Sequence, residues 1–265
     1  MKTNFEFLTD EQIMLSAPSV FTDKASPDVS SYYTHIPTSR VINDMRLLGW
    51  DVVQAAEIKA RKRVGYQKHL VRFRNPEILI EGGNHDKVFP EILLTNSHDG
   101  KSLFVFQAGL FRLVCTNGLV IADENFANLR IYHIGYNFGE LQTLIHGVVE
   151  KLPLTVESLN KMRETKLAEE KLLEFARKAV SIRLNKPENE VKIDLKELIT
   201  PSRTQDRGKN LWVTFNVVQE KLMNGNFDYA LKDKAKTRKA RMVKNFQQDH
   251  KINQQLFKLA LEYAS

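Results

Sequence analysis

The sequence predicts an α+β protein, with an antiparallel sheet meander in the N-terminal half and a helical C-terminal half. Residues 50–136 contain short extended segments separated by Gly, Asn or Asp, which is typical of strands joined by tight turns. From residue 138 onward the spacing of apolar residues becomes helical. Because strands and helices are segregated along the chain, the pattern favours α+β over a parallel α/β fold.

The length and composition of the chain are those of a globular protein. The 265 residues are 42% hydrophobic and 27% charged, which excludes a fibrous or wholly disordered chain. This length favours one large domain or one domain with a helical appendage. We predict an α+β sheet domain at residues 1–150 and a helical region with a basic terminal helix at residues 151–265. The one cysteine excludes an intrachain disulfide and a zinc site built from several cysteines.

Signals for membrane insertion or export do not occur in the sequence. No run of about 18 apolar residues is found, and residues 1–10 lack the basic start and apolar stretch of a signal peptide. We therefore expect a cytoplasmic protein with no membrane partner.

The N-terminal elements follow from caps and apolar spacing. Thr9 predicts the start of a short helix, and residues 17–35 are expected to form mostly loop. Apolar residues at helical spacing from Val41 to Leu48 predict an amphipathic helix that ends at Gly49.

The predicted sheet begins with a hairpin. Residues 50–61 and 66–75 are extended segments joined by a charged turn that contains Gly65. Arg72 and Arg74 alternate with apolar residues, so guanidinium groups are expected along one strand face. Further strands are predicted at residues 91–96, 103–107, 111–116, 119–122 and 129–136.

The helical half is predicted from periodicity and from helix-breaking residues. Residues 141–149 carry a core-facing apolar stripe that Pro153 is expected to interrupt. A second helix is predicted at residues 155–184 and a third at residues 211–223. The last segment, residues 232–264, is predicted to be one long polar helix whose first half is very basic.

Two basic clusters stand out in a chain with a formal charge of +7. We expect the first to form a positive sheet face; it consists of Arg61, Lys62, Arg63, Lys68, Arg72, Arg74 and Arg112. The second, on the terminal helix, consists of Lys232, Lys234, Lys236, Arg238, Lys239, Arg241 and Lys244. Such clusters can contact a phosphate backbone, and we expect Arg72 and Arg74 to matter most because a sheet holds them in place. The alternatives are a solvated basic helix and a solvated sheet face whose arginines pair with Glu57, Glu77 and Glu81.

Residues 96–100, with the sequence Asn-Ser-His-Asp-Gly, are predicted to form a turn between strands. The alternative interpretation makes His98 and Asp99 a metal or acid/base pair, together with His85 and Asp86. Cys115 precedes an Asn-Gly turn and is expected to be a buried structural thiol, because no base partner is evident from the spacing.

Several strings occur in the order seen in one known family: residues 17–21, 66–73, 94–102, 111–119 and 211–212. Over residues 10–226 the chain resembles the phage/plasmid-like protein family of the domain of unknown function 932. The resemblance implies an origin in a phage or another mobile element. It carries over no catalytic residues, because the family has no settled activity.

The chain contains no phosphate-binding loop, no dinucleotide fingerprint and no Gly-x-Ser-x-Gly string. These absences remove ATP, dinucleotide and serine-hydrolase interpretations. From the basic clusters, and from the phage or plasmid origin that the resemblance implies, we expect a non-enzymatic nucleic-acid-binding protein of a phage or plasmid, with DNA as partner and a role in single-strand binding or annealing. No cofactor, metal or catalytic residue is assigned, and self-association into a homo-oligomer stays open. One alternative is a metal-dependent enzyme acting on nucleotides or nucleic acid through His98 and Asp99. The other is a protein that interacts with the host or belongs to the virion.

Overall fold

The computed structural model describes residues 6–59, 64–82, 86–102, 104–112, 117–120, 129–131, 136–232 and 236–265. The chain divides into two compact units. The first contains Met1–Leu113 and Glu124–Leu152, and the second contains Val114–Asp123 and Pro153–Ser265. The main division therefore falls inside helix α3 (Phe138–Glu164), two residues beyond the end of the sheet domain expected from the sequence.

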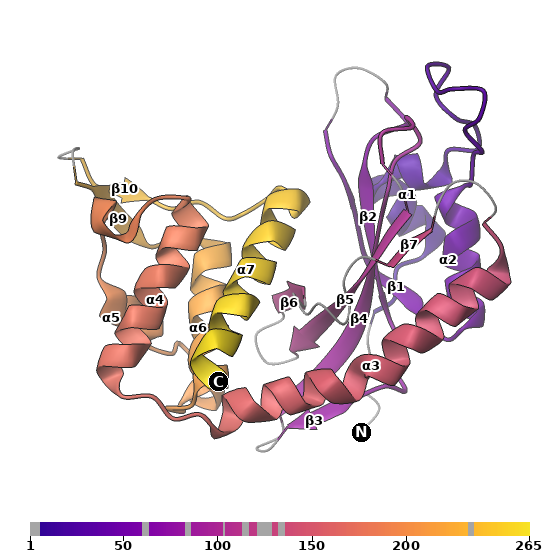
Figure 1. The fold of residues 1–265 in the computed structure, drawn as a ribbon. Helices are drawn as coiled ribbons and strands as arrows, with labels where there is room; N and C mark the ends of the chain where they lie inside the picture. Colours follow the sequence, from indigo (N-terminus) through magenta and orange to yellow (C-terminus); the bar gives the residue numbers. More distant parts are fainter. Residues whose placement is uncertain are drawn as a thin grey trace. The chain divides into compact units, whose positions relative to one another are not determined.

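The first unit is built on an antiparallel sheet with the strand order β1-β2-β4-β5 (Figure 1). These strands are β1 (Asp51–Glu57), β2 (His69–Arg74), β4 (Asp86–Asn96) and β5 (Phe104–Arg112). Two short strands extend these four, with β3 (Ile80–Gly82) paired to β4 and β7 (Leu129–Ile131) paired to β5. The predicted hairpin is confirmed, because β1 and β2 pair antiparallel with Ala55 opposite Val71.

Two helices pack beside β1 (Figure 1), and a 3₁₀ turn contacts both helices. Helix α1 (Asp10–Ser16) begins with a capping box in which Thr9 and Gln12 bond each other's backbone amides. Turn η1 (Pro18–Phe21) lies in the segment expected to be loop, and α2 (Thr38–Leu47) is the predicted amphipathic helix. The core of this unit is closed by fully buried aromatic residues, among them Trp50, Phe73, Phe89, Phe104 and Phe106.

The second unit is mainly helical. Helices α4 (Glu169–Leu184), α6 (Leu211–Asn224) and α7 (Phe246–Ala264) pack against one another, and α5 (Leu195–Ile199) contacts α4 and α6. Its core includes the fully buried Phe175, Phe215 and Phe257. A small sheet has the order β10-β9-β8, with β8 (Val191–Lys192), β9 (Asp228–Leu231) and β10 (Arg238–Lys239). Turns η4 (Glu188–Glu190) and η5 (Thr204–Asp206) and strand β6 (Asn117–Val120) complete the unit.

The α+β fold class is confirmed, but three predicted elements are wrong in detail. The two strands predicted at residues 103–107 and 111–116 are one strand, β5, over the described part. Helix α3 continues through Pro153, because its buried apolar face, which includes Leu152 and Leu159, outweighs the lost backbone hydrogen bond. The chain leaves this helix after Glu164, where the Thr165 carbonyl accepts the amide of Leu211 instead.

The third correction concerns the C-terminal segment. The helix predicted at residues 232–264 begins only at Phe246, and the basic residues before it lie in a hairpin and an extended segment. Their backbone groups bond residues at the end of α6, and a helix of like charges would be self-repulsive. None of the helices in the described part of the chain is long and apolar enough to cross a membrane.

Candidate nucleic-acid interface

Arg72 and Arg74 do not form the exposed positive sheet face predicted for them. Their side chains are only 7% and 5% exposed. Arg72 donates from Nη1 to Oε2 of Glu91 at 2.7 Å, and Arg74 donates from Nη2 to Oε1 of the same carboxylate at 2.6 Å. Glu91 on β4 lies directly opposite Arg74 in the sheet register, so strand pairing brings these charges together.

Aromatic rings also lie close to Arg74. Its guanidinium lies 3.7 Å from the ring centroid of Phe111 and 5.9 Å from that of Phe89. Burial lowers the pKa of Arg74, an effect that the adjacent Glu91 carboxylate opposes. These contacts are those of a buried structural ion pair, which requires its partner to remain charged.

Of the remaining members of the first cluster, the structure describes Arg112 and Lys68, and neither is fully exposed. Arg112 is 4% exposed, and Lys68 is half-buried. Arg61, Lys62 and Arg63 lie outside the described residues. Glu91, which the sequence did not suggest as a partner, is a carboxylate that both Arg72 and Arg74 contact.

The segment with His98 and Asp99 has the structure of a turn. Asp99 accepts hydrogen bonds at Oδ1 from the Ser97 hydroxyl at 2.6 Å and from the Lys101 amide at 3.1 Å. Gly100 supplies a positive φ of 72°. These contacts account for the Asp-Gly pair by turn chemistry.

His98 turns into the core of the first unit, away from the contacts of Asp99. Its Nε2 lies 3.4 Å from the Thr38 hydroxyl, and its ring lies 4.7 Å from that of His35 and 5.2 Å from that of His69, measured between centroids. No set of three or more His, Cys, Asp or Glu side chains within the described ranges is arranged to hold a metal ion. His85 and Cys115 lie outside those ranges.

His69 is the fully buried centre of this polar cluster. Its Nδ1 donates to the Gln67 carbonyl at 3.0 Å, so Nε2 accepts from the Thr38 hydroxyl at 2.8 Å. The Ser19 hydroxyl also lies 3.0 Å from Nδ1. Burial lowers the pKa of His69 to about 4, which keeps the imidazole neutral near neutral pH.

The second basic cluster is exposed, and we call residues 232–244 the basic arm. Six of its described cations are exposed to solvent: Lys232, Lys236, Arg238, Lys239, Arg241 and Lys244. None of the six forms an ion pair with a carboxylate that the structure describes. Lys234 lies outside the described residues.

The arm is held against the ends of α4 and α6 by its backbone. Arg183 on α4 donates from Nε to the carbonyl of Leu222 and from Nη2 to the carbonyl of Arg241, both at 2.7 Å. The Ala240 carbonyl accepts from the amide of Asn226 at 3.0 Å, and the amide of Val243 donates to Met223 at 2.9 Å. These bonds position the arm without using its cationic side chains.

Gly225 allows this close approach at the end of α6. Its φ of 74° lies in the region that favours glycine. A Cβ at this position would lie 2.6 Å from the carbonyl carbon of Arg241. The sequence did not identify Gly225 or Arg183 as residues that hold this segment, because nothing local in the sequence reveals a contact 58 residues away.

Three comparisons relate the chain to known proteins. A family model described as Domain of unknown function (DUF932) matches residues 27–257. Two similar proteins from Escherichia coli strain K12 are the UPF0380 protein YfjQ, 30% identical over 258 residues, and the UPF0380 protein YafZ, 31% identical over 258 residues. Each alignment covers 96% of this chain and 90% of the relative. No solved structure matches the chain.

Proposed function

The chain belongs to the DUF932 family, and from this premise we propose that it is a non-enzymatic nucleic-acid-binding protein of a phage or plasmid that uses the basic arm. The observation that carries the proposal is the exposure of six arm cations with no described carboxylate partner. A phosphate backbone would neutralise these charges and release its own counterions, which makes binding favourable.

The anchoring of the arm supports the same function. Because Arg183 and the backbone of residues 223–226 hold the arm, Arg238, Lys239 and Arg241 lose less freedom on binding than they would on a loose tail. Contacts of this kind position a strand but do not distinguish bases, so sequence preference is expected to be low.

An aromatic ring lies beside these cations. Tyr229 on β9 is the register partner of Arg238 on β10, and it is half-buried. An aromatic ring next to cations can stack on an unpaired base. We therefore propose DNA as the partner, with single strands bound more tightly than duplex, in keeping with a role in single-strand binding or annealing.

The test is fluorescence polarisation with labelled single- and double-stranded DNA of equal length at low salt. The arm variant carries Arg238→Ala, Lys239→Ala and Arg241→Ala. The control variant removes the same charge from exposed positions on α4 and α7 through Arg177→Ala, Lys251→Ala and Lys258→Ala. We expect the arm variant to bind at least tenfold more weakly than the control variant.

Two results would overturn the proposal. The first is no binding of either DNA by the unmodified chain at low salt. The second is equal affinity of the arm variant and the control variant, with both shown to be folded by circular dichroism. Binding of duplex as tight as that of single strands would remove the single-strand role only.

A further inference from the structure

A pocket with a volume of about 650 Å³ opens in the second unit. One wall is the start of α4, with Ala168 and Glu169, and another is the end of α5, with Lys196, Ile199 and Thr200. The third wall is the loop between η5 and α6, which contributes Arg207, Gly208 and Lys209. The volume lies within the range of small-molecule sites, about 300–1,000 Å³.

The lining of this pocket combines an apolar surface with an excess of positive charge. Leu172, Ile199 and Pro201 supply the apolar surface. Lys196, Arg207 and Lys209 are its cations, and Glu169 is its one carboxylate. Glu169 lies 3.4 Å from Nζ of Lys196, so Arg207 and Lys209 are the cations left to attract an anion.

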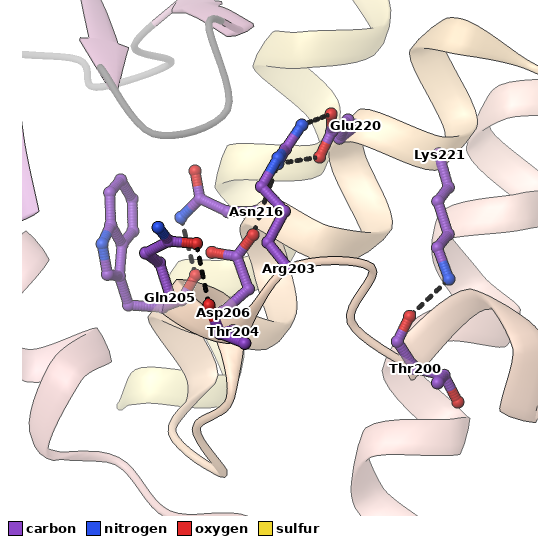
Figure 2. A network of polar contacts seen from close by, with 9 residues as sticks. Thr200, Arg203, Thr204, Gln205, Asp206, Asn216, Glu220 and Lys221 are labelled. Atoms are coloured by element: carbon purple, nitrogen blue, oxygen red, sulfur yellow. Dashed lines mark hydrogen bonds and ion pairs between the residues drawn. The ribbon is translucent and has the colours of Figure 1, made fainter.

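The loop that carries these two cations is held in place by an ionic network (Figure 2). Arg203 donates from Nη1 to Glu220 at 2.7 Å and also bonds that carboxylate through Nη2. It lies 3.4 Å from Asp206, whose side chain is 2% exposed and which directly precedes Arg207. The pocket wall is therefore tied to α6 before any ligand arrives.

A second tie holds the opposite wall. The ammonium group of Lys221 on α6 donates to the carbonyl of Thr200 at the end of α5 (Figure 2). The same group donates to the carbonyl of Glu197 on α5. Thr200 lines the pocket. The loop with Arg207 and Lys209 and the end of α5 are thus both bonded to α6, which makes the pocket a preformed site.

We propose that this pocket binds a small phosphomonoester with an apolar or aromatic body, such as a nucleoside monophosphate. A phosphomonoester carries a charge of about −1.5 to −2 at pH 7, which matches Arg207 and Lys209. The body of the ligand packs against Leu172, Ile199 and Pro201. The arm cations do not line this pocket, so the proposal stands independently of nucleic-acid binding by the arm.

The test is isothermal titration calorimetry of the full chain with AMP, adenosine and inorganic phosphate at low salt. We expect AMP to bind at least tenfold more tightly than either adenosine or inorganic phosphate. Adenosine can contact only the apolar wall, and inorganic phosphate can contact only the cations. A variant with Arg207→Ala and Lys209→Ala is expected to lose at least tenfold in AMP affinity. The control variant with Arg238→Ala and Lys239→Ala is expected to bind AMP as the unmodified chain does.

A second variant keeps all three cations and introduces a repelling charge. Thr200 is exposed on the pocket wall, so Thr200→Glu places a carboxylate there without disturbing the core. We expect it to weaken AMP binding at least tenfold as well. No AMP binding at 1 mM, binding of adenosine as tight as that of AMP, or AMP affinity that survives both variants would overturn the proposal, whatever the outcome for DNA.

Discussion

At the scale of single residues, the alternation of Arg72 and Arg74 predicted correctly that both side chains lie on one face of β2. It did not predict whether that face is exposed or buried, because this depends on a carboxylate in another strand. Glu91 is 1% exposed and 17 residues beyond Arg74. A strand pattern reveals a face, but only tertiary pairing decides whether a charged face meets solvent or the core.

Removing the charge of Glu91 is expected to destabilise the first unit. Glu91→Gln leaves two buried guanidinium groups without their shared carboxylate, and breaking a buried pair in this way costs about 3–5 kcal/mol. Glu77→Gln, at an exposed position, is the matched control and should change stability by less than about 0.5 kcal/mol. Urea unfolding monitored by circular dichroism measures both; equal stabilities would contradict the assigned ion pair.

The buried imidazole of His69 predicts how stability depends on pH. Its pKa is about 4 in the folded chain, below the ordinary value of 6.5, so the unfolded chain binds more protons between these values. The contribution of the neutral His69 to the free energy of unfolding is therefore fully present above pH 6.5. It decreases as the pH falls toward 4, by at most about 1.4 kcal/mol per pH unit.

The same measurement with two variants isolates the contribution of His69. His69→Gln should reduce the pH dependence of the free energy of unfolding, while Gln142→Ala, at an exposed position on α3 that carries no titratable group, should leave it unchanged. A stability of the unmodified chain that rises as the pH falls from 6.5 to 4 would show that the sign is wrong.

At the scale of elements, the periodic helices and the first hairpin could be predicted, and the segments held by distant contacts could not. The apolar stripes of α2 and α6 are local, and the sequence therefore predicts both helices. The described part of the basic arm from residue 238 to residue 243 is extended because residues 223–227 and Arg183 bond its backbone, and such contacts leave no local pattern. The same holds for Pro153, whose helix-breaking tendency is outweighed by packing.

Substitution of Gly225 by alanine is expected to destabilise the chain, and the same substitution at an uncrowded glycine in a helix is expected to stabilise it. Gly225→Ala places a methyl group against the backbone of residue 241 at a positive φ, and we expect a loss of at least about 1 kcal/mol in stability and weaker DNA binding. Gly147→Ala, inside α3 with nothing within 4 Å, should stabilise by about 0.5–1 kcal/mol. Thermal unfolding ranks the two variants, and a stabilised Gly225→Ala would contradict the observed packing.

Arg183 is a positioning residue for the arm. Arg183→Lys keeps the positive charge but cannot donate to the carbonyls of Leu222 and Arg241 with the same fork. We expect faster amide hydrogen exchange in residues 238–243 and DNA binding weakened severalfold, with the melting temperature lowered only slightly. Unchanged exchange in this segment would show that Arg183 does not hold it.

At the scale of the whole molecule, the α+β class and the order of strands before helices could be predicted, because both depend on periodicity. The position of the candidate interface in the fold could not be predicted from the sequence. From the sequence, Arg72 and Arg74 were expected to matter most for binding, but their burial in the first unit turns attention to the arm in the second unit. Net charge counts buried and exposed cations alike, whereas only exposed cations can contact a phosphate backbone.

The salt dependence of DNA binding tests the central claim most directly. Each phosphate contact to a single strand contributes about 0.7 to the slope of log affinity against log salt, so losing Arg238, Lys239 and Arg241 should lower the slope by about 2. The control variant with Arg177→Ala, Lys251→Ala and Lys258→Ala should keep the slope of the unmodified chain. An arm variant with the same slope as the control would show that the arm does not contact the phosphates.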